Sequence, residues 1–218
     1  MIRFPFQNSQ SQSLKVLCLG AHCDDIAIGC GGTILTLLDQ VSAIEVVWVV
    51  MTSTEKRQVE EQNAAAEFLG IGGTKQIIVK GWQDGYLPKY WSEVKDFFEE
   101  LKRAINPDLI LTHFRDDRHQ DHRVVSDLTW NTFRHHLILE YEIPKYDGDL
   151  GSPNVFVPLA EQHCREKARK IVECFPSQRG RQWFTEDVFV SLARLRGMEA
   201  ASDSQFAEAF YCRKLLLG

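Results

Sequence analysis

The stretch "LKVLCLGAHCDDIAIGCGGT", residues 14–33, places a histidine and two adjacent aspartates between an apolar run and a group of glycines. The run 14–20 is short and almost wholly apolar, which is typical of a strand that is buried on both faces. The glycines lie where the chain enters a helical pattern, and we expect them to allow close packing of that helix on the sheet. The stretch therefore predicts a strand, a charged turn and a helix.

Similar units recur along the chain. Further apolar runs predict strands at 44–51, 75–80, 108–114 and 154–159. Apolar residues spaced three and four apart predict amphipathic helices at 31–40, 55–70, 91–105 and 121–139. Alternation of strands and helices favours an α/β fold, Rossmann-like, in three layers (α/β/α) with a mostly parallel sheet.

The region after about residue 160 has a different pattern. Helical spacing continues at 160–175, 185–197 and 204–216, and the turn-rich stretch 146–154 predicts a loop. We find no linker, repeat or low-complexity tract in front of this region. The sequence therefore predicts a single domain, residues 1–218, with the mostly helical C-terminal part packed on it.

Composition narrows the class of protein. The chain has 218 residues, a net charge of −5 and six cysteines without a CxxC pair. No long basic run offers a nucleic-acid surface, and no continuous apolar segment resembles a signal peptide or a membrane span. Cysteines without a CxxC pair or a regular spacing fit a reducing compartment better than a secreted, cross-linked protein. We expect a soluble, cytoplasmic protein with no nucleic-acid or membrane partner.

A second cluster of ionisable residues, "THFRDDRHQDHRVV" (112–125), follows the fourth predicted strand. Ligands of open parallel sheets bind outside the carboxyl ends of the strands, so this cluster and "AHCDD" are expected to meet there. His22 and Asp25 are three residues apart across a turn, and His119 and His122 are three apart entering a helix. Each pair can face one point, as a metal site requires.

Two histidines and one carboxylate, with a fourth position open to water, are the usual composition of a catalytic zinc site. The remaining groups then have roles in proton transfer. Asp24 is predicted to take a proton from water, and His119 to stabilise or protonate what leaves. Asp121 is predicted to orient the His119 ring and raise its pKa.

Other interpretations of these residues exist. Adjacent aspartates at a strand–helix junction often cap the helix, and a single histidine there is often structural. For the loop residues His113 and 115–118, surface charge is the default interpretation. Dinucleotide binding is disfavoured, because "GAHCDD" lacks the GxGxxG pattern and "VVWVVMTS", at the second strand, lacks the acidic residue that would hold a ribose.

With these two clusters, the sequence resembles the LmbE-like, or PIG-L, family of zinc-dependent N-acetylglucosaminyl deacetylases. The family motifs AHPDD, GCGGT and HxDH stand here as "AHCDD", "GCGGT" and "HQDH", in order and after the expected strands. Weaker likenesses are "RQVEEQNAAAEFLGI", "WQDGYL" and "AEAF". The resemblance covers residues 14–130 strongly and the chain after 140 loosely, and it implies the LmbE-like deacetylase fold.

The resemblance also implies roles for individual residues. One zinc ion per chain would be held by His22, Asp25 and His122, with Asp24 as general base and His119 as general acid or oxyanion partner. Arg57 and Asp84 fall where the family has residues that face the sugar.

Two positions depart from the family pattern, since Cys23 replaces a proline and Ala27 stands where many relatives have an acidic residue. Either the Cys23 thiol is oxidised or perturbs the choice of metal, or Cys23 is a tolerated small residue whose side chain points away from the metal.

The expected reaction is removal of an N-acetyl group, with release of acetate, from an amino sugar or a soluble sugar conjugate such as a nucleotide-linked one. Three alternatives stay open: an amidase acting on a thiol–sugar conjugate or another amide, a two-metal phosphoesterase, and a non-catalytic sugar-binding protein. Homo-oligomers are common in the resembled family, but the sequence gives no subunit number.

Overall fold

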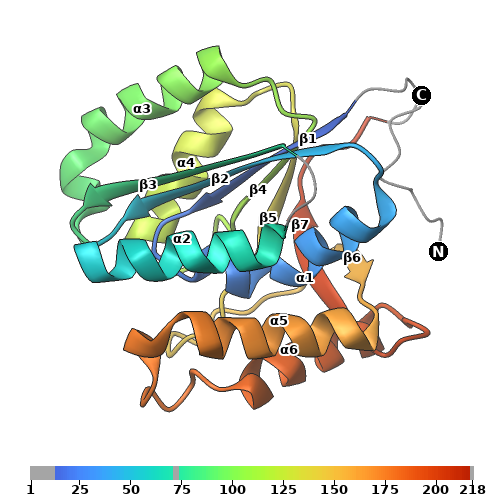
Figure 1. Ribbon diagram of the computed structural model, residues 1–218. Coiled ribbons are helices and arrows are strands. Elements are labelled where there is room, and N and C mark those ends of the chain that lie inside the picture. Colours follow the sequence, from blue (N-terminus) through green and yellow to red (C-terminus); the bar gives the residue numbers. More distant parts are fainter. Residues whose placement is uncertain (1–12, 71–73, 217–218) are drawn as a thin grey trace.

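The computed structural model describes residues 13–70 and 74–216, and Figure 1 shows a central sheet between layers of helices. The strands are β1 (Leu14–Gly20), β2 (Ile44–Thr52), β3 (Thr74–Trp82), β4 (Leu109–His113), β5 (Leu137–Tyr141), β6 (Val155–Pro158) and β7 (Ala207–Cys212). The α-helices are α1 (Asp25–Gln40), α2 (Glu55–Leu69), α3 (Trp91–Ala104), α4 (Gln120–Thr132), α5 (Glu161–Cys174) and α6 (Glu186–Glu199). Two short 3₁₀ helices are η1 (Leu87–Tyr90) and η2 (Pro176–Gln178).

The strand order within the described residues is β3-β2-β1-β4-β5-β7-β6. The first five strands of this order pair in parallel, whereas β7 runs antiparallel to both β5 and β6. This confirms the predicted mostly parallel sheet. Successive strands extend outward from β1 in one direction and from β4 in the other, so the topological switch point lies between β1 and β4.

Alternate residues of β1 belong to two different cores. Val16 and Cys18 pack with the α1 and α2 side of the sheet, and Leu17 and Leu19 pack with the α3 and α4 side. In Figure 1, α3 and α4 cover one face, while α1 and α2 cover the other with α5 and α6 beyond them. Burial on both faces explains why this strand is apolar at nearly every position.

The glycines of α1 allow the close packing that the sequence predicts. A Cβ atom at Gly29 would lie 2.1 Å from the Tyr141 ring on β5, and one at Gly32 would lie 2.6 Å from a Leu159 methyl group. The backbone N–H of Gly32 also donates to the Glu208 carboxylate on β7 (2.8 Å). Helix α1 is therefore fixed against the sheet directly behind the turn that carries "AHCDD".

One predicted helix, 121–139, is wrong in its second half. Helix α4 ends at Thr132, and residues from Leu137 onward form the buried strand β5 between β4 and β7. A short apolar run such as "LILEY" fits a helix or a strand equally by its spacing. Its place in the middle of the sheet decides for the strand.

The predicted helix at 204–216 is also wrong, because residues Ala207–Cys212 form strand β7. The first four residues of β7 are buried, so the strand lacks the alternation that would have marked it in the sequence. The loop at 146–154 contains no helix or strand, as predicted, and β6 confirms the strand expected at 154–159.

The predicted domain, 1–218, extends beyond the described residues at 1–12, 71–73 and 217–218. Within the described part, strands from both ends of the chain share one sheet, and α5 packs on α1 and α2. None of the helices described there is long and apolar enough to cross a membrane.

Candidate metal centre

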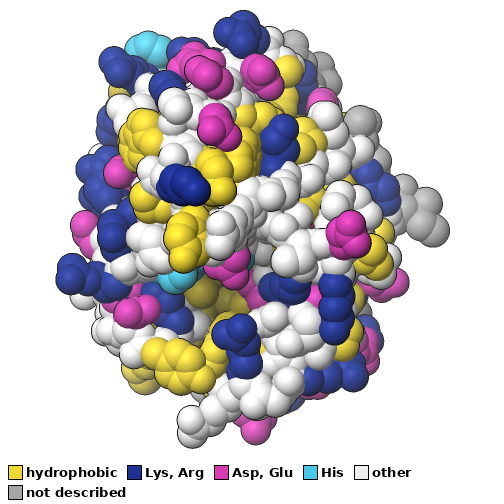
Figure 2. Space-filling view, turned by 90° about the vertical axis from the view of Figure 1, so that its left-hand side faces the viewer, with side chains coloured by type: hydrophobic (Ala, Val, Ile, Leu, Met, Phe, Trp, Pro, Cys, Tyr) yellow, Lys and Arg dark blue, Asp and Glu magenta, His cyan; other side chains and the backbone are white. Residues whose placement is uncertain are grey.

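The two ionisable clusters lie on loops that follow neighbouring strands. The first follows β1 and the second follows β4, and these strands pair in parallel at the switch point. Their carboxyl ends therefore meet at one edge of the sheet. Figure 2 shows this edge: histidine and acidic side chains lie at the bottom of a hollow, with lysine and arginine side chains around it.

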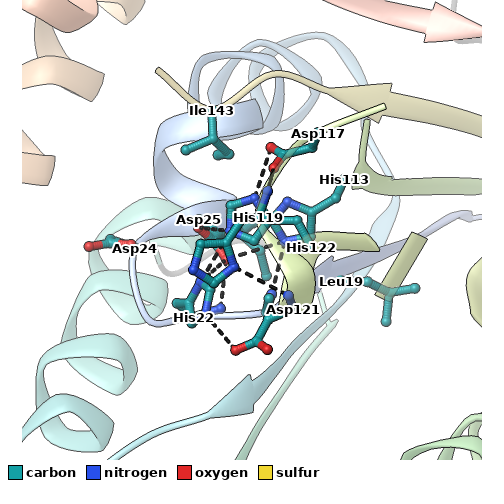
Figure 3. Close-up of polar contacts among 12 residues, drawn as sticks. Leu19, His22, Asp24, Asp25, His113, Asp117, His119, Asp121, His122 and Ile143 are labelled. Atoms are coloured by element: carbon teal, nitrogen blue, oxygen red, sulfur yellow. Dashed lines mark hydrogen bonds and ion pairs between the residues drawn. The ribbon is translucent and has the colours of Figure 1, made fainter. Parts of the chain in front are cut away.

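His22, Asp25 and His122 converge at this edge (Figure 3). His22 Nδ1 lies 3.1 Å from His122 Nε2 and 3.3 Å from Asp25 Oδ2. His122 Nε2 lies 3.5 Å from Asp25 Oδ1, and these last two side chains are only 3% and 4% exposed. Two imidazole nitrogens and a carboxylate oxygen at such separations form a donor set that fits a metal ion.

The electrostatics around the two imidazoles also favour a cation. Burial lowers the pKa of His22, but the carboxylates of Asp25 and Asp121 outweigh it and raise that pKa well above its usual value. The same carboxylates stabilise any positive charge placed beside the ring. Burial, together with His113, lowers the pKa of His122 to about 3. His122 is thus neutral, which is the form that binds metals.

Asp24 directly precedes α1 in a strained backbone conformation. Its φ is 104°, in the left-handed region, and its N–H donates to Glu61 Oε2 (2.9 Å). The Asp24 side chain makes no capping hydrogen bond to α1, so the helix-cap interpretation does not explain it. Burial raises the pKa of Asp24 to about 7, although Arg57 lowers it. Strain of this kind persists where surrounding contacts hold it, often at functional sites.

Arg57, which the family resemblance places against substrate, is engaged by the protein itself. One end of its guanidinium, Nη2, donates to Asp24 Oδ2 (2.9 Å) and to the Cys23 carbonyl oxygen. The other, Nη1, donates to Glu60 Oε2 (3.1 Å) and to Ser177 Oγ (3.0 Å). Figure 3 shows Asp24 to one side of the histidine rings, where this pairing draws its carboxylate.

His119 lies beside the cluster, with its ring edge-on to His22 at a centroid distance of 4.6 Å. Its Nδ1 accepts a hydrogen bond from the Asp121 backbone N–H (3.3 Å), which leaves Nε2 to carry the proton of the neutral ring. Burial, and then the charge of His22, lower the pKa of His119, although Asp121 raises it. A neutral ring of this tautomer is a hydrogen-bond donor.

The Asp121 carboxylate contacts His22 rather than the His119 ring, which differs from the sequence-based expectation. Its Oδ2 lies 3.0 Å from His22 Nε2 and accepts from the Gly85 N–H (2.7 Å), and its Oδ1 accepts from the Leu87 N–H (3.0 Å). The reason is geometric, since the backbone N–H of Asp121 already faces His119 while its side chain points toward the 85–87 segment.

Asp84 lies at the rim of the centre. Its Oδ1 is 3.2 Å from His22 Nε2, yet 75% of its side chain remains exposed. Of the two residues predicted to contact substrate, Asp84 is therefore the one whose side chain is open to a ligand.

Sequence reasoning missed two buried residues, His113 and Asp117, by treating their loop as surface charge. His113, the last residue of β4, stacks on His122 at a centroid distance of 3.9 Å. Asp117 Oδ2 lies 2.9 Å from His122 Nδ1 and accepts from Lys145 Nζ (2.8 Å). The surface interpretation holds for Asp116, whose side chain is 72% exposed. The sequence signal that could have found His113 is its position at the carboxyl end of a predicted strand, where the other site residues lie.

The two departures from the family pattern are both buried. Cys23 is 1% exposed, and its Sγ lies 3.5 Å from the Thr52 carbonyl oxygen. Burial raises the pKa of this thiol far above its usual value, so it stays protonated and is a poor metal ligand. Ala27, in the first turn of α1, is fully buried in the core. The contacts support the interpretation of Cys23 as a tolerated small residue.

Comparisons with known proteins agree with this geometry. The family model described as PIG-L, GlcNAc-PI de-N-acetylase, matches residues 17–133, which is more than half of the chain. Diacetylchitobiose deacetylase from Thermococcus kodakarensis is 34% identical over 126 residues. That match covers 50% of this chain and 45% of the other, so the chain spans about half the length of this curated relative.

Two solved structures share the fold. The conserved protein TT1542 from Thermus thermophilus superposes with a TM-score of 0.73 at 18% identity, covering 94% of this chain and 97% of that one. N,N'-diacetylchitobiose deacetylase from Pyrococcus horikoshii, in complex with an inhibitor, gives a TM-score of 0.69 at 21% identity, covering 96% and 87%. The LmbE-like deacetylase fold expected from the sequence is confirmed.

Proposed function

The chain belongs to the GlcNAc-PI de-N-acetylase (PIG-L) family, and on this premise we propose that it hydrolyses the N-acetyl group of an amino sugar or a soluble sugar conjugate and releases acetate. The observation that carries the proposal is the convergence of His22, Asp25 and His122, with Asp24 and His119 beside them. The deacetylases among its relatives support the choice of an N-acetyl sugar.

His22, Asp25 and His122 are the residues that would hold the metal ion, which we propose to be one zinc per chain. Bound there, zinc would supply Lewis-acid polarisation of the acyl carbonyl and a lowered pKa for a water molecule. The donor set, two imidazoles and one carboxylate, is the observation that supports zinc.

The protein's own groups move the protons. Asp24 accepts a proton from the attacking water, and its pKa of about 7 matches a base that works near neutral pH. His119, whose neutral ring carries its proton on Nε2, donates a hydrogen bond to the developing oxyanion, and the proton that Asp24 took from water passes to the leaving amine as the C–N bond breaks. The two residues lie on loops that follow different strands, Asp24 after β1 and His119 after β4.

Three further residues complete the proposed site. Asp84 faces the substrate from the rim, and its exposed carboxylate can accept hydrogen bonds from sugar hydroxyls. Asp121 holds His22 and the backbone of residues 85–87 in place. Arg57 reaches substrate only through its partner Asp24, because its guanidinium is already bound by protein groups.

We also propose that residues 1–218 form one domain and that the protein is cytoplasmic. The shared sheet supports the first, and six cysteines without a disulfide support the second. We propose no macromolecular partner beyond a second copy of the chain, for which light scattering in solution is the direct test.

The test of function is acetate release from a panel of N-acetyl sugars, free and nucleotide-linked, by zinc-loaded protein and by the same protein after chelation. Zinc-dependent release is the expected result. No release from any member, with one zinc per chain, would contradict deacetylation and favour another amide, including thiol–sugar conjugates. About two metals per chain with phosphatase activity would favour the phosphoesterase, and sugar binding without turnover would favour a binding protein.

Removing the negative charge behind His122 tests the metal centre separately. Asp117→Asn is expected to weaken zinc binding about 10- to 100-fold, because the ring of a metal-binding histidine loses the anion that orients it. Competition with a chromophoric chelator measures the affinity. Asp149→Asn is the matched control, since Asp149 binds the same lysine, Lys145, without touching His122. Equal zinc affinity in the two variants would contradict this role of Asp117.

A further inference from the structure

Arg57 connects the proposed base to the C-terminal part of the chain. Its Nη2 binds Asp24 Oδ2, and its Nη1 binds Ser177 Oγ in η2. Ser177 lies beyond the residues that the family model matches, 17–133. The Phe175 ring also lies 5.4 Å from the Arg57 guanidinium carbon. A segment remote in sequence thus contacts the side chain that holds the Asp24 carboxylate.

Glu60 joins Arg57 and Ser177 into a closed set of contacts. Glu60 Oε1 accepts from the Ser177 N–H (2.8 Å), and Oε2 accepts from both Ser177 Oγ (2.6 Å) and Arg57 Nη1 (3.1 Å). Glu60 is 6% exposed. A buried carboxylate with this many donors is held in a single position, and it holds its donors in turn.

These contacts fix the plane of the Arg57 guanidinium. Because the guanidinium is rigid and planar, fixing Nη1 on Glu60 and Ser177 also fixes Nη2, and with it the Asp24 oxygen bound there. We propose that Glu60 and Ser177 are positioning residues, which hold Arg57 and through it keep the Asp24 carboxylate placed for proton transfer; the inference rests on the proposed function. Arg57, Glu60 and Ser177 together form the arginine clamp.

The test compares Ser177→Ala with Ser177→Thr in zinc-loaded protein. The alanine variant loses the hydroxyl that binds both Arg57 and Glu60, and its kcat is expected to fall about tenfold, with KM within about twofold, because a misplaced reacting group slows the chemical step. The threonine variant keeps the hydroxyl and is expected to retain the wild-type kcat. Glu60→Gln, which loses the charge, is expected to behave like Ser177→Ala.

Two controls separate positioning from a general loss of structure. Ser202→Ala and Glu173→Gln make the same chemical changes outside the arginine clamp and should leave kcat unchanged. In an Asp24→Asn background, Ser177→Ala should cause no further loss, because its effect passes through Asp24. Bound zinc should stay at one per chain in every variant.

The outcomes distinguish this proposal from the proposed function. If the wild type releases acetate and kcat is unchanged in Ser177→Ala and Glu60→Gln, the arginine clamp is overturned while the proposed function stands. So would a tenfold loss that persists in the Asp24→Asn background, or an equal loss in Ser177→Thr. Absence of acetate release by the wild type would instead overturn the proposed function.

Discussion

Asp24→Asn is expected to lower kcat for acetate release about 10²- to 10⁴-fold, the range typical for the loss of a general base. Asparagine has nearly the same shape, tolerates the left-handed backbone that Asp24 adopts, and still accepts a hydrogen bond from Arg57. What it loses is the ability to take a proton at neutral pH. The variant should therefore fold and bind zinc like the wild type and fail only in the chemical step.

Steady-state kinetics and elemental analysis of the same preparation check this prediction. The expected combination is a large fall in kcat with zinc still at about one per chain. Asp39→Asn, on the exposed end of the same helix α1, serves as the matched control and should leave both values unchanged. If Asp24→Asn turned over at the wild-type rate, the role of Asp24 as base would be wrong.

The sequence predicted the elements whose apolar pattern fits only one kind of secondary structure. Strand β1 and helix α3 are examples, since an apolar run and a one-sided apolar stripe each fit one kind of element there. The helix predictions for Leu137–Tyr141 and Ala207–Cys212 were wrong, because local spacing does not report which neighbours a segment will find. Both segments are strands because the sheet offers them partners.

The candidate site was predictable to the extent that it follows topology. His22, Asp25 and His122 come together because β1 and β4 are neighbours, and their motifs stand at the strand ends. Side-chain directions were not predictable in the same way. Asp121 faces His22 instead of His119, and Arg57 binds Asp24 instead of being free to contact substrate, because those contacts depend on how α2, α4 and the 85–87 segment pack.

The buried partner Asp117 was hidden for a related reason. In "HFRDDRH" the charged residues 115–118 look alike, and only the structure separates the exposed Asp116 from Asp117, which lies under His122. Spacing along a loop does not determine which of two adjacent aspartates turns inward. Asp117 turns inward because the second ring nitrogen of His122 needs a hydrogen-bond partner.

His122→Gln should remove bound zinc and, with it, activity. His122 Nε2 lies within 3.5 Å of both other proposed ligands, and the ring is buried between them. Glutamine has a similar volume and keeps a hydrogen-bonding group near Asp117, which limits damage to the fold. With two ligands left, zinc should fall from one per chain to a small fraction after dialysis, and acetate release should fall in proportion.

Thermal unfolding distinguishes loss of the metal from loss of the fold. An ion that binds only the folded state stabilises it by about 2.7 kcal/mol at a concentration one hundred times its Kd. Added zinc should therefore raise the Tm of the chelated wild type and of His163→Gln, whose ring bonds Thr36 away from the centre, but not that of His122→Gln. A zinc-dependent rise in the Tm of His122→Gln equal to that of the wild type would show that His122 is not a ligand. The convergence of His22, Asp25 and His122 at this edge of the sheet would then need an explanation other than metal binding.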